Sequence, residues 1–196
     1  MDIEKTIKNM KARRFEVSHF ATGSEAAQYI AANTHNTQVG IGGSTTVKEI
    51  GLYELIKEDN EVFWHWIEPG NETCNKACAA PVYICSANGI SEEGEIVNID
   101  GRGNRLAGTC WGEKKIYIVA GTNKITPNLH TAIDRARNVA APKNISRFPY
   151  NTPCKVDGKC HDCRSADRAC NGMLILFGPM FGTKVEVVLI DEELGM

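Results

Sequence analysis

Short apolar runs that suit β-strands alternate with helical patterns along most of this chain. The run at residues 116–120 is apolar and rich in β-branched side chains, as expected for a parallel strand buried on both faces. Further on, apolar residues recur at helical spacing, at Leu129, Ala132, Ile133, Ala136 and Ala140. This alternation predicts an α/β fold in which a mostly parallel sheet is flanked by helices.

The same pattern predicts the order of the elements. Strands are expected at residues 15–20, 38–41, 62–67, 82–86, 95–99, 116–120, 174–177 and 185–190. One helix is expected to begin at residue 23, and a second to follow the loop at residues 42–46 and run to about residue 57. Further helices are expected at residues 72–79, 104–111 and 129–140, with Pro142 beyond the end of the last one. Because no repeat or linker divides the chain, residues 1–196 are expected to form one domain.

The charge balance argues against two classes of partner. Lys and Arg total 22 against 24 acidic residues, so the formal net charge of -2 gives no case for nucleic acid. No apolar run is long enough to span a bilayer, and the charged amino-terminal segment does not resemble a signal peptide. The chain is therefore expected to be cytoplasmic, without membrane insertion, and its eight cysteines are expected to stay reduced.

The first candidate binding loop follows the strand at residues 38–41. It consists of Gly42, Gly43, Ser44, Thr45 and Thr46. The glycines allow close approach of the backbone, and the hydroxyl residues open a helix, so the loop could bind phosphate, carboxylate or a similar small anion. A plain helix cap after a tight turn explains the same residues equally well.

A second glycine-rich loop follows the predicted hairpin. Asn88 stands at the end of one strand, and Asp100, Gly101, Gly103 and Asn104 end the next. The glycines could bind a second anionic group, and Asp100 could accept a substrate hydroxyl or act as a base. The alternative is a hairpin and a glycine turn in which Asp100 caps a helix.

The run SANGISEEGEIVNIDGRGN and the segment IYIVAGTNK resemble the LUD domain of lactate utilisation proteins. The loop at residues 42–46 and the segment Cys-His-Asp-Cys fit the same family, and the resemblance covers nearly the whole chain. It implies the fold of ribose-5-phosphate isomerase, glucosamine-6-phosphate deaminase and the CoA transferases. It also implies a role in the oxidation of lactate or another small organic acid, together with iron–sulfur oxidoreductase subunits. In those relatives a lysine follows the next strand, as Lys124 does here.

The sequence also departs from those relatives. Asn88 stands where the isomerases carry an acidic residue, and an amide cannot serve as a general base. Asp100 and Lys124 are therefore the candidate catalytic residues, with Glu93 and Glu95 as other nearby carboxylates. Two alternatives stay open. One is a stand-alone isomerase or transferase that acts on a sugar phosphate or acyl-CoA, and the other is a non-catalytic assembly or regulatory module. A homo-oligomer is compatible with each.

Four cysteines lie together in a polar loop at residues 149–172, before the last strands. Cys160 and Cys163 form a Cys-x-x-Cys pair, and Cys154 and Cys170 could complete a set of four thiolates. Thiolates favour zinc or an iron–sulfur cluster, so the loop is a candidate metal site. A redox dithiol and surface thiols without a role are the alternatives. The other cysteines, Cys74, Cys78, Cys85 and Cys110, are expected in the core.

Overall fold

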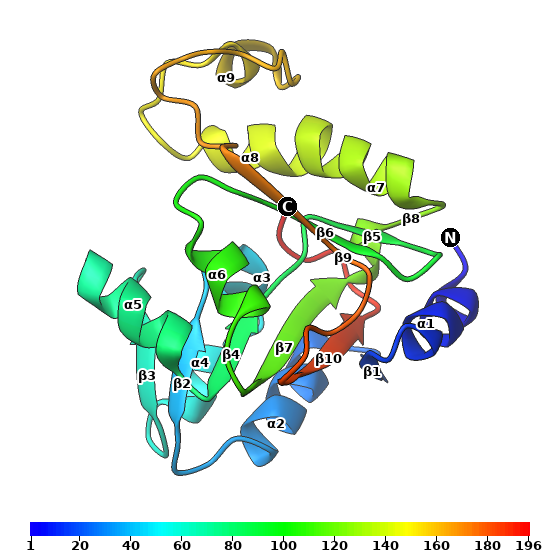
Figure 1. Cartoon of the computed structure of the whole chain (residues 1–196), viewed down its shortest axis with the longest axis vertical. Coiled ribbons are helices and arrows are strands. Elements are labelled where there is room, and N and C mark those ends of the chain that lie inside the picture. The colour runs from blue at the N-terminus through cyan, green and yellow to red at the C-terminus, as the bar shows by residue number, and fades with distance from the viewer.

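A computed structural model describes residues 1–196. Its main sheet has six parallel strands in the order β1-β10-β7-β4-β2-β3, and we call it sheet A. These strands are β1 (Glu16–Phe20), β2 (Gln38–Ile41), β3 (Glu61–Trp64), β4 (Val82–Cys85), β7 (Lys114–Gly121) and β10 (Thr183–Ile190). The expected α/β fold with a mostly parallel, helix-flanked sheet is confirmed (Figure 1).

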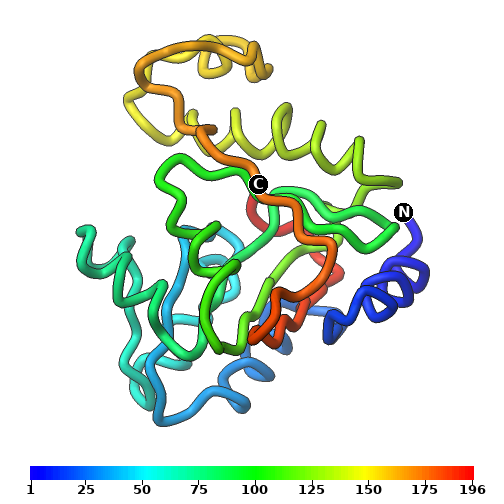
Figure 2. The backbone as a smooth tube through the Cα atoms, in the orientation of Figure 1, coloured from blue at the N-terminus to red at the C-terminus, as the bar shows by residue number.

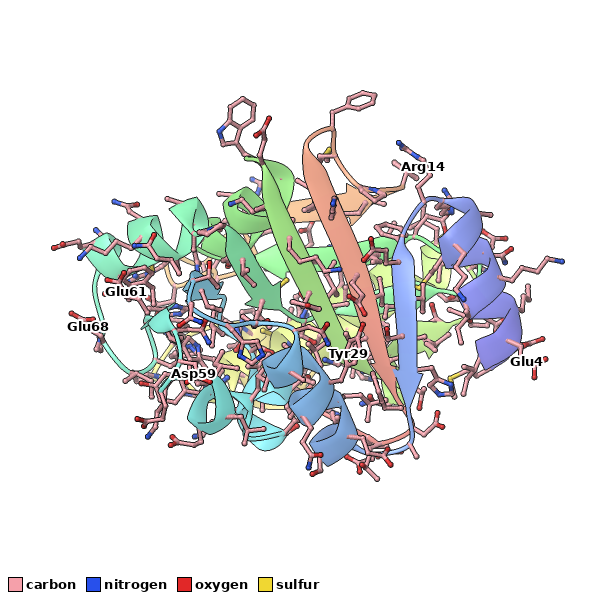
Figure 3. All side chains as sticks on the ribbon, turned by 90° about the horizontal axis from the view of Figure 1, so that it is seen from below. Glu4, Arg14, Tyr29, Asp59, Glu61 and Glu68 are labelled. Atoms are coloured by element: carbon pink, nitrogen blue, oxygen red, sulfur yellow. The ribbon has the colours of Figure 1, made fainter.

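Both faces of sheet A are buried, which explains the unbroken apolar run in β7. Ile116 and Ile118 face one hydrophobic cluster, whereas Tyr117 and Val119 face another. The second cluster lies against α2 (Gly23–Ala32), α3 (Thr45–Glu49) and α4 (Leu52–Ile56). Figure 3 views the molecule from below, with α2 lying across this face. The other face carries α1 (Ile3–Ala12), α5 (Asn71–Ala79) and α6 (Asn104–Cys110).

A second, four-stranded sheet covers part of that other face, and we call it sheet B. Its order is β8-β5-β6-β9, and its strands are β8 (Ile125–Thr126), β5 (Gly89–Ser91), β6 (Ile96–Asp100) and β9 (Gly172–Leu176). A long helical segment lies over sheet B and consists of α7 (Leu129–Arg135), η2 (Ala136–Ala140) and α8 (Ala141–Ile145). Ala132 and Ala136 pack there against Val97 and Ile99.

Two predicted helices differ from the structure. The helix expected to run to residue 57 is broken at Gly51, whose left-handed φ of 68° ends α3 and begins α4. The helix expected to end before Pro142 instead continues through it. The segment η2 is a π-helix in which the Ala141 amide donates to the Ala136 carbonyl, and Pro142 then lies in the first turn of α8.

The cysteine loop at residues 149–172 connects α8 to β9, as expected, and contains one short helix, α9 (Pro153–Asp157). In Figure 2 this segment, drawn in yellow and orange, arches beyond the end of α8 and returns to sheet B. No helix of the chain has the length and apolar character needed to cross a membrane.

Candidate functional site

A cavity of about 550 Å³ lies at the carboxyl ends of β2, β3, β4 and β7. This edge is where parallel α/β sheets bind their ligands. The loop after β6, the end of α8 and part of the cysteine loop complete its walls. The cavity brings together nine of the predicted residues: Gly43, Ser44, Thr45, Thr46, Asn88, Asp100, Gly101, Asn104 and Lys124.

The other two predicted glycines, Gly42 and Gly103, do not line the cavity. A Cβ on Gly42 would lie 2.8 Å from both Cγ of Arg105 and the Tyr83 hydroxyl, so this glycine permits close packing behind the loop. Gly103 has a left-handed φ of 87° and precedes the first residue of α6. Both glycines therefore shape the loops and do not line the cavity.

Lys124 is the most unusual polar side chain of the cavity, because it is only 2% exposed. Its Nζ donates to Oγ1 of Thr46 at 2.8 Å and to Oγ of Ser86 at 2.7 Å. No carboxylate lies within ion-pair distance of it. Burial, with smaller contributions from Arg135 and Arg105, lowers the pKa of Lys124 to about 7. Near neutral pH this amine can therefore either donate or accept a proton.

The loop at residues 42–46 supplies hydroxyl groups around that amine. Ser44 caps α3 by accepting a hydrogen bond from the Val47 amide at 3.1 Å, which confirms the helix-cap interpretation for this residue. Thr46, in the first turn of α3, accepts the hydrogen bond from Lys124, and the hydroxyl of Ser86 donates to Thr46 at 3.3 Å. The loop thus both starts a helix and contributes to the cavity.

Asp100 and Asn88 hold the second loop in place. The Asp100 carboxylate accepts hydrogen bonds from the amides of Gly101 at 2.8 Å and Arg105 at 2.9 Å, and it lies 3.8 Å from Nε of Arg105. The Asn88 side-chain oxygen accepts from the Ile99 amide at 2.8 Å. These contacts fix the loop backbone, while catalysis by Asp100 stays a prediction.

The other carboxylates considered from the sequence lie elsewhere. Glu95 pairs with Arg13, which follows α1, and neither Glu93 nor Glu95 lines the cavity. The hairpin carboxylates therefore do not take the place of the acidic residue that Asn88 replaces.

Cationic side chains outnumber carboxylates in the cavity wall. The cations are Arg102, Arg105, Lys124, Arg147 and Arg168, and the carboxylates are Asp100 and Asp167. The whole chain has a formal net charge of -2. The excess of positive charge is therefore local to the cavity, as expected for a site that binds an anion.

Sequence reasoning missed one wall of this cavity. Arg147, Phe148 and Tyr150 follow α8, and Trp66 follows β3. No motif marks them, because the fold brings them together from distant parts of the chain. His65, noted in the sequence for its place between two tryptophans, also lines the cavity; burial, together with Arg102, lowers its pKa, and its Nδ1 has no hydrogen-bond partner.

The structure does not bring the four loop cysteines together as a metal site. No group of three or more His, Cys, Asp or Glu side chains lies in a metal-holding arrangement. Cys160, with its Sγ 3.7 Å from Nη2 of Arg137, and Cys170 line a second hollow of about 220 Å³, whereas Cys154 contacts Thr152. Burial raises the pKa of Cys170, and the thiols of Cys160 and Cys163 act in the same direction.

The remaining cysteines lie mostly where the sequence predicts. Cys74 and Cys85 are buried, and burial raises the pKa of Cys85 to about 12. Cys78 and Cys110 are partly buried, so they lie at the margin of the core.

Comparison with known proteins agrees with this architecture. A DUF162 family protein from Deinococcus radiodurans, solved by crystallography, resembles the chain with a TM-score of 0.58. The two share 13% identity, over 96% of this chain and 95% of that one, so the likeness concerns the fold alone. A comparison with curated proteins finds no match. The family model of the LUD domain matches residues 3–190, and the chain therefore belongs to the LUD domain family.

Proposed function

We propose that this protein binds an organic anion in the cavity and exchanges a proton with it through Lys124. The observation that carries the proposal is a buried amine without a carboxylate partner, in a cavity whose wall has an excess of cationic side chains. An incoming carboxylate or phosphate would supply the missing negative charge. Thr46 and Ser86 hold the amine at the inner end of the cavity.

The protonation state of Lys124 determines whether its amine can act as a base or as an acid. With a pKa of about 7, the amine is divided between its neutral and charged forms near neutral pH. The neutral amine can remove a proton from a carbon next to a carbonyl group, and the ammonium can return it. Asp100 would support this reaction indirectly, because its contacts hold the loop that carries Arg102 and the first turn of α6, which carries Arg105.

Membership of the LUD domain family supports a wider role in the use of lactate or another small organic acid. In that role the protein would act in the cytoplasm beside iron–sulfur oxidoreductase subunits. An isomerase or transferase acting on a sugar phosphate or acyl-CoA would use the same cavity.

Calorimetric titration with pyruvate, L-lactate and ribose 5-phosphate, each over a pH series, tests the proposal. At least one of these anions should bind, and its affinity should fall by up to tenfold per pH unit above about pH 7, where Lys124 loses its charge. Lys124→Met should weaken binding below pH 7 and remove the pH dependence. Lys48→Met, on an exposed lysine of α3, is the matched control and should bind like the wild type. Equal affinity of the wild type and Lys124→Met at every pH would refute the role of Lys124.

A further inference from the structure

The outer part of the cavity has a different character from its inner end. Trp66, Arg147, Phe148 and Tyr150 all line it, and together we call them the aromatic wall. The guanidinium carbon of Arg147 lies 4.6 Å from the centre of the Trp66 ring and 5.7 Å from that of Phe148. The rings of Phe148 and Tyr150 stack at 5.1 Å, with 19° between their planes. The aromatic rings and the Arg147 guanidinium thus form one continuous surface on this side of the cavity.

The size of the cavity also exceeds the needs of a three-carbon acid. Its volume of about 550 Å³ lies within the range of about 300–1,000 Å³ that is typical of sites for cofactor-sized ligands. A ligand that reaches from Lys124 to the aromatic wall would therefore fill space that pyruvate or lactate leaves open.

Two guanidinium groups of this cavity have no carboxylate partner. Arg102 makes no ion pair. Arg147 donates only two long hydrogen bonds, to Oγ1 of Thr45 at 3.3 Å and to Oδ1 of Asn144 at 3.4 Å. Arg105 and Arg168, by contrast, lie beside Asp100 and Asp162. Unpaired guanidinium groups bind phosphate well, because their fork of N–H donors matches its oxygens.

We infer that the ligand is a phosphate ester that carries a planar heteroaromatic ring, as a nucleoside phosphate does. Its ring would take the place of the Arg147 guanidinium, whose carbon lies 4.6 Å from the centre of the Trp66 ring. The displaced Arg147, together with Arg102, would bind the phosphate. The inference rests on the proposed function, since it adds a ring and a phosphate to the anion whose inner end meets Lys124.

Calorimetric titration with ADP, ribose 5-phosphate and pyruvate tests this inference. ADP should bind about fivefold to 150-fold more tightly than ribose 5-phosphate, because base stacking on an aromatic side chain contributes about 1–3 kcal/mol per base. Trp66→Leu should remove that difference, whereas Arg147→Gln should weaken both phosphate esters. Trp111→Leu, at a tryptophan that is 82% exposed and outside the cavity, is the matched control and should bind like the wild type.

The outcomes separate the two proposals. If ribose 5-phosphate binds as tightly as ADP to the wild-type protein, the ring site is refuted, whatever the folding of the Trp66 variant. The binding of organic anions would then still stand. If none of the three compounds binds, and L-lactate does not bind either, both proposals fail. If ADP binds tightly but Trp66→Leu folds and binds it equally well, the ring lies elsewhere and the inference is overturned.

Discussion

The buried amine of Lys124 imposes a cost on folding at neutral pH. Its pKa falls from 10.5 to about 7 in the folded chain, so the unfolded chain binds more protons between these values. The contribution of this group to stability therefore increases as pH rises from about 7 to about 10.5, and it is most unfavourable below pH 7. A protein retains such a residue for its chemistry rather than for its stability.

We therefore expect Lys124→Met to be more stable than the wild type at pH 7, by an amount on the order of a few kcal/mol. The difference should shrink steadily as the pH approaches 10. Urea unfolding at several pH values, with the unfolding free energy of the two proteins compared, measures this. A variant that is less stable than the wild type at pH 7 would show that the hydrogen bonds to Thr46 and Ser86 outweigh the burial cost.

The sequence predicts that Lys124 follows a buried strand, but not that its amine lacks a carboxylate. The partners Thr46 and Ser86 are 78 and 38 residues away, and only the strand order β7-β4-β2 places them beside it. Residues at the ends of predicted strands could thus be gathered into one site from the sequence. The aromatic wall could not, because Trp66 and Arg147 carry no local pattern that marks a cavity.

At the level of elements, the cysteine loop is the segment where sequence and structure differ most. The spacing of its thiols suits four ligands to one metal, yet the side chains do not converge. The same loop contributes Ala166, Asp167, Arg168 and Ala169 to the cavity wall. Arg168 connects the two regions, since it donates to the backbone oxygens of Cys163 and Cys170 while it lines the cavity.

Zinc or iron–sulfur binding by the four cysteines stays a prediction, and it requires this loop to rearrange. We expect anaerobically purified protein to contain about one zinc ion or one cluster per chain, because four thiolates favour these metals. Elemental analysis and the absorbance spectrum measure it. Cys163→Ser should lower the metal content, whereas Cys110→Ser, outside the loop, should not. Protein that holds neither metal and whose eight thiols all react freely would contradict the prediction.

At the scale of the whole molecule, the buried carboxylate of Glu186 in β10 connects the neighbouring strands β1 and β7 and the helix α2. Glu186 accepts hydrogen bonds from Ser18 of β1 at 2.5 Å and from Tyr29 of α2 at 2.9 Å, and Lys115 of β7 lies 2.8 Å away. Tyr29 is labelled in Figure 3. Burial acts to raise the pKa of Glu186, but the hydrogen bonds from Lys115, Ser18 and Tyr29 outweigh it, and the pKa is lowered.

We expect Glu186→Gln to destabilise the fold by roughly 1–3 kcal/mol, because it leaves Lys115 without its buried partner. The loss should be largest near neutral pH and should vanish as pH falls through the lowered pKa, since the wild-type carboxyl is then protonated as well. Thermal unfolding between pH 3 and pH 7 measures it. The matched control is Glu193→Gln, on an exposed carboxylate near residue 196, which should unfold like the wild type. A difference between Glu186→Gln and wild type that persists unchanged at pH 3 would contradict this explanation.

Hydrophobic periodicity predicts most strands of sheet A, because inner strands such as β7 are buried on both faces and form continuous apolar runs. It does not predict that sheet B is a separate sheet. Strand β8 has two residues, too few for any pattern, and β9 pairs with β6 across more than seventy residues of chain. Hydrophobic periodicity also fails to predict the π-helix and the helix after it, because a proline such as Pro142 normally marks the end of a helix.

The π-helix η2 also determines the direction in which the side chains of the following helix, α8, point around the helix axis. Each residue of an α-helix turns the chain by about 100°, and a π-turn holds one residue more than an α-turn. A regular helix over residues 129–145 would therefore present a different side of α8 to the cavity. The direction in which the chain leaves the helix, with the Arg147 guanidinium over the Trp66 ring, depends on this irregularity. Five residues, of which only Ala140 lines the cavity, thus help determine which side chains of the following segment reach it.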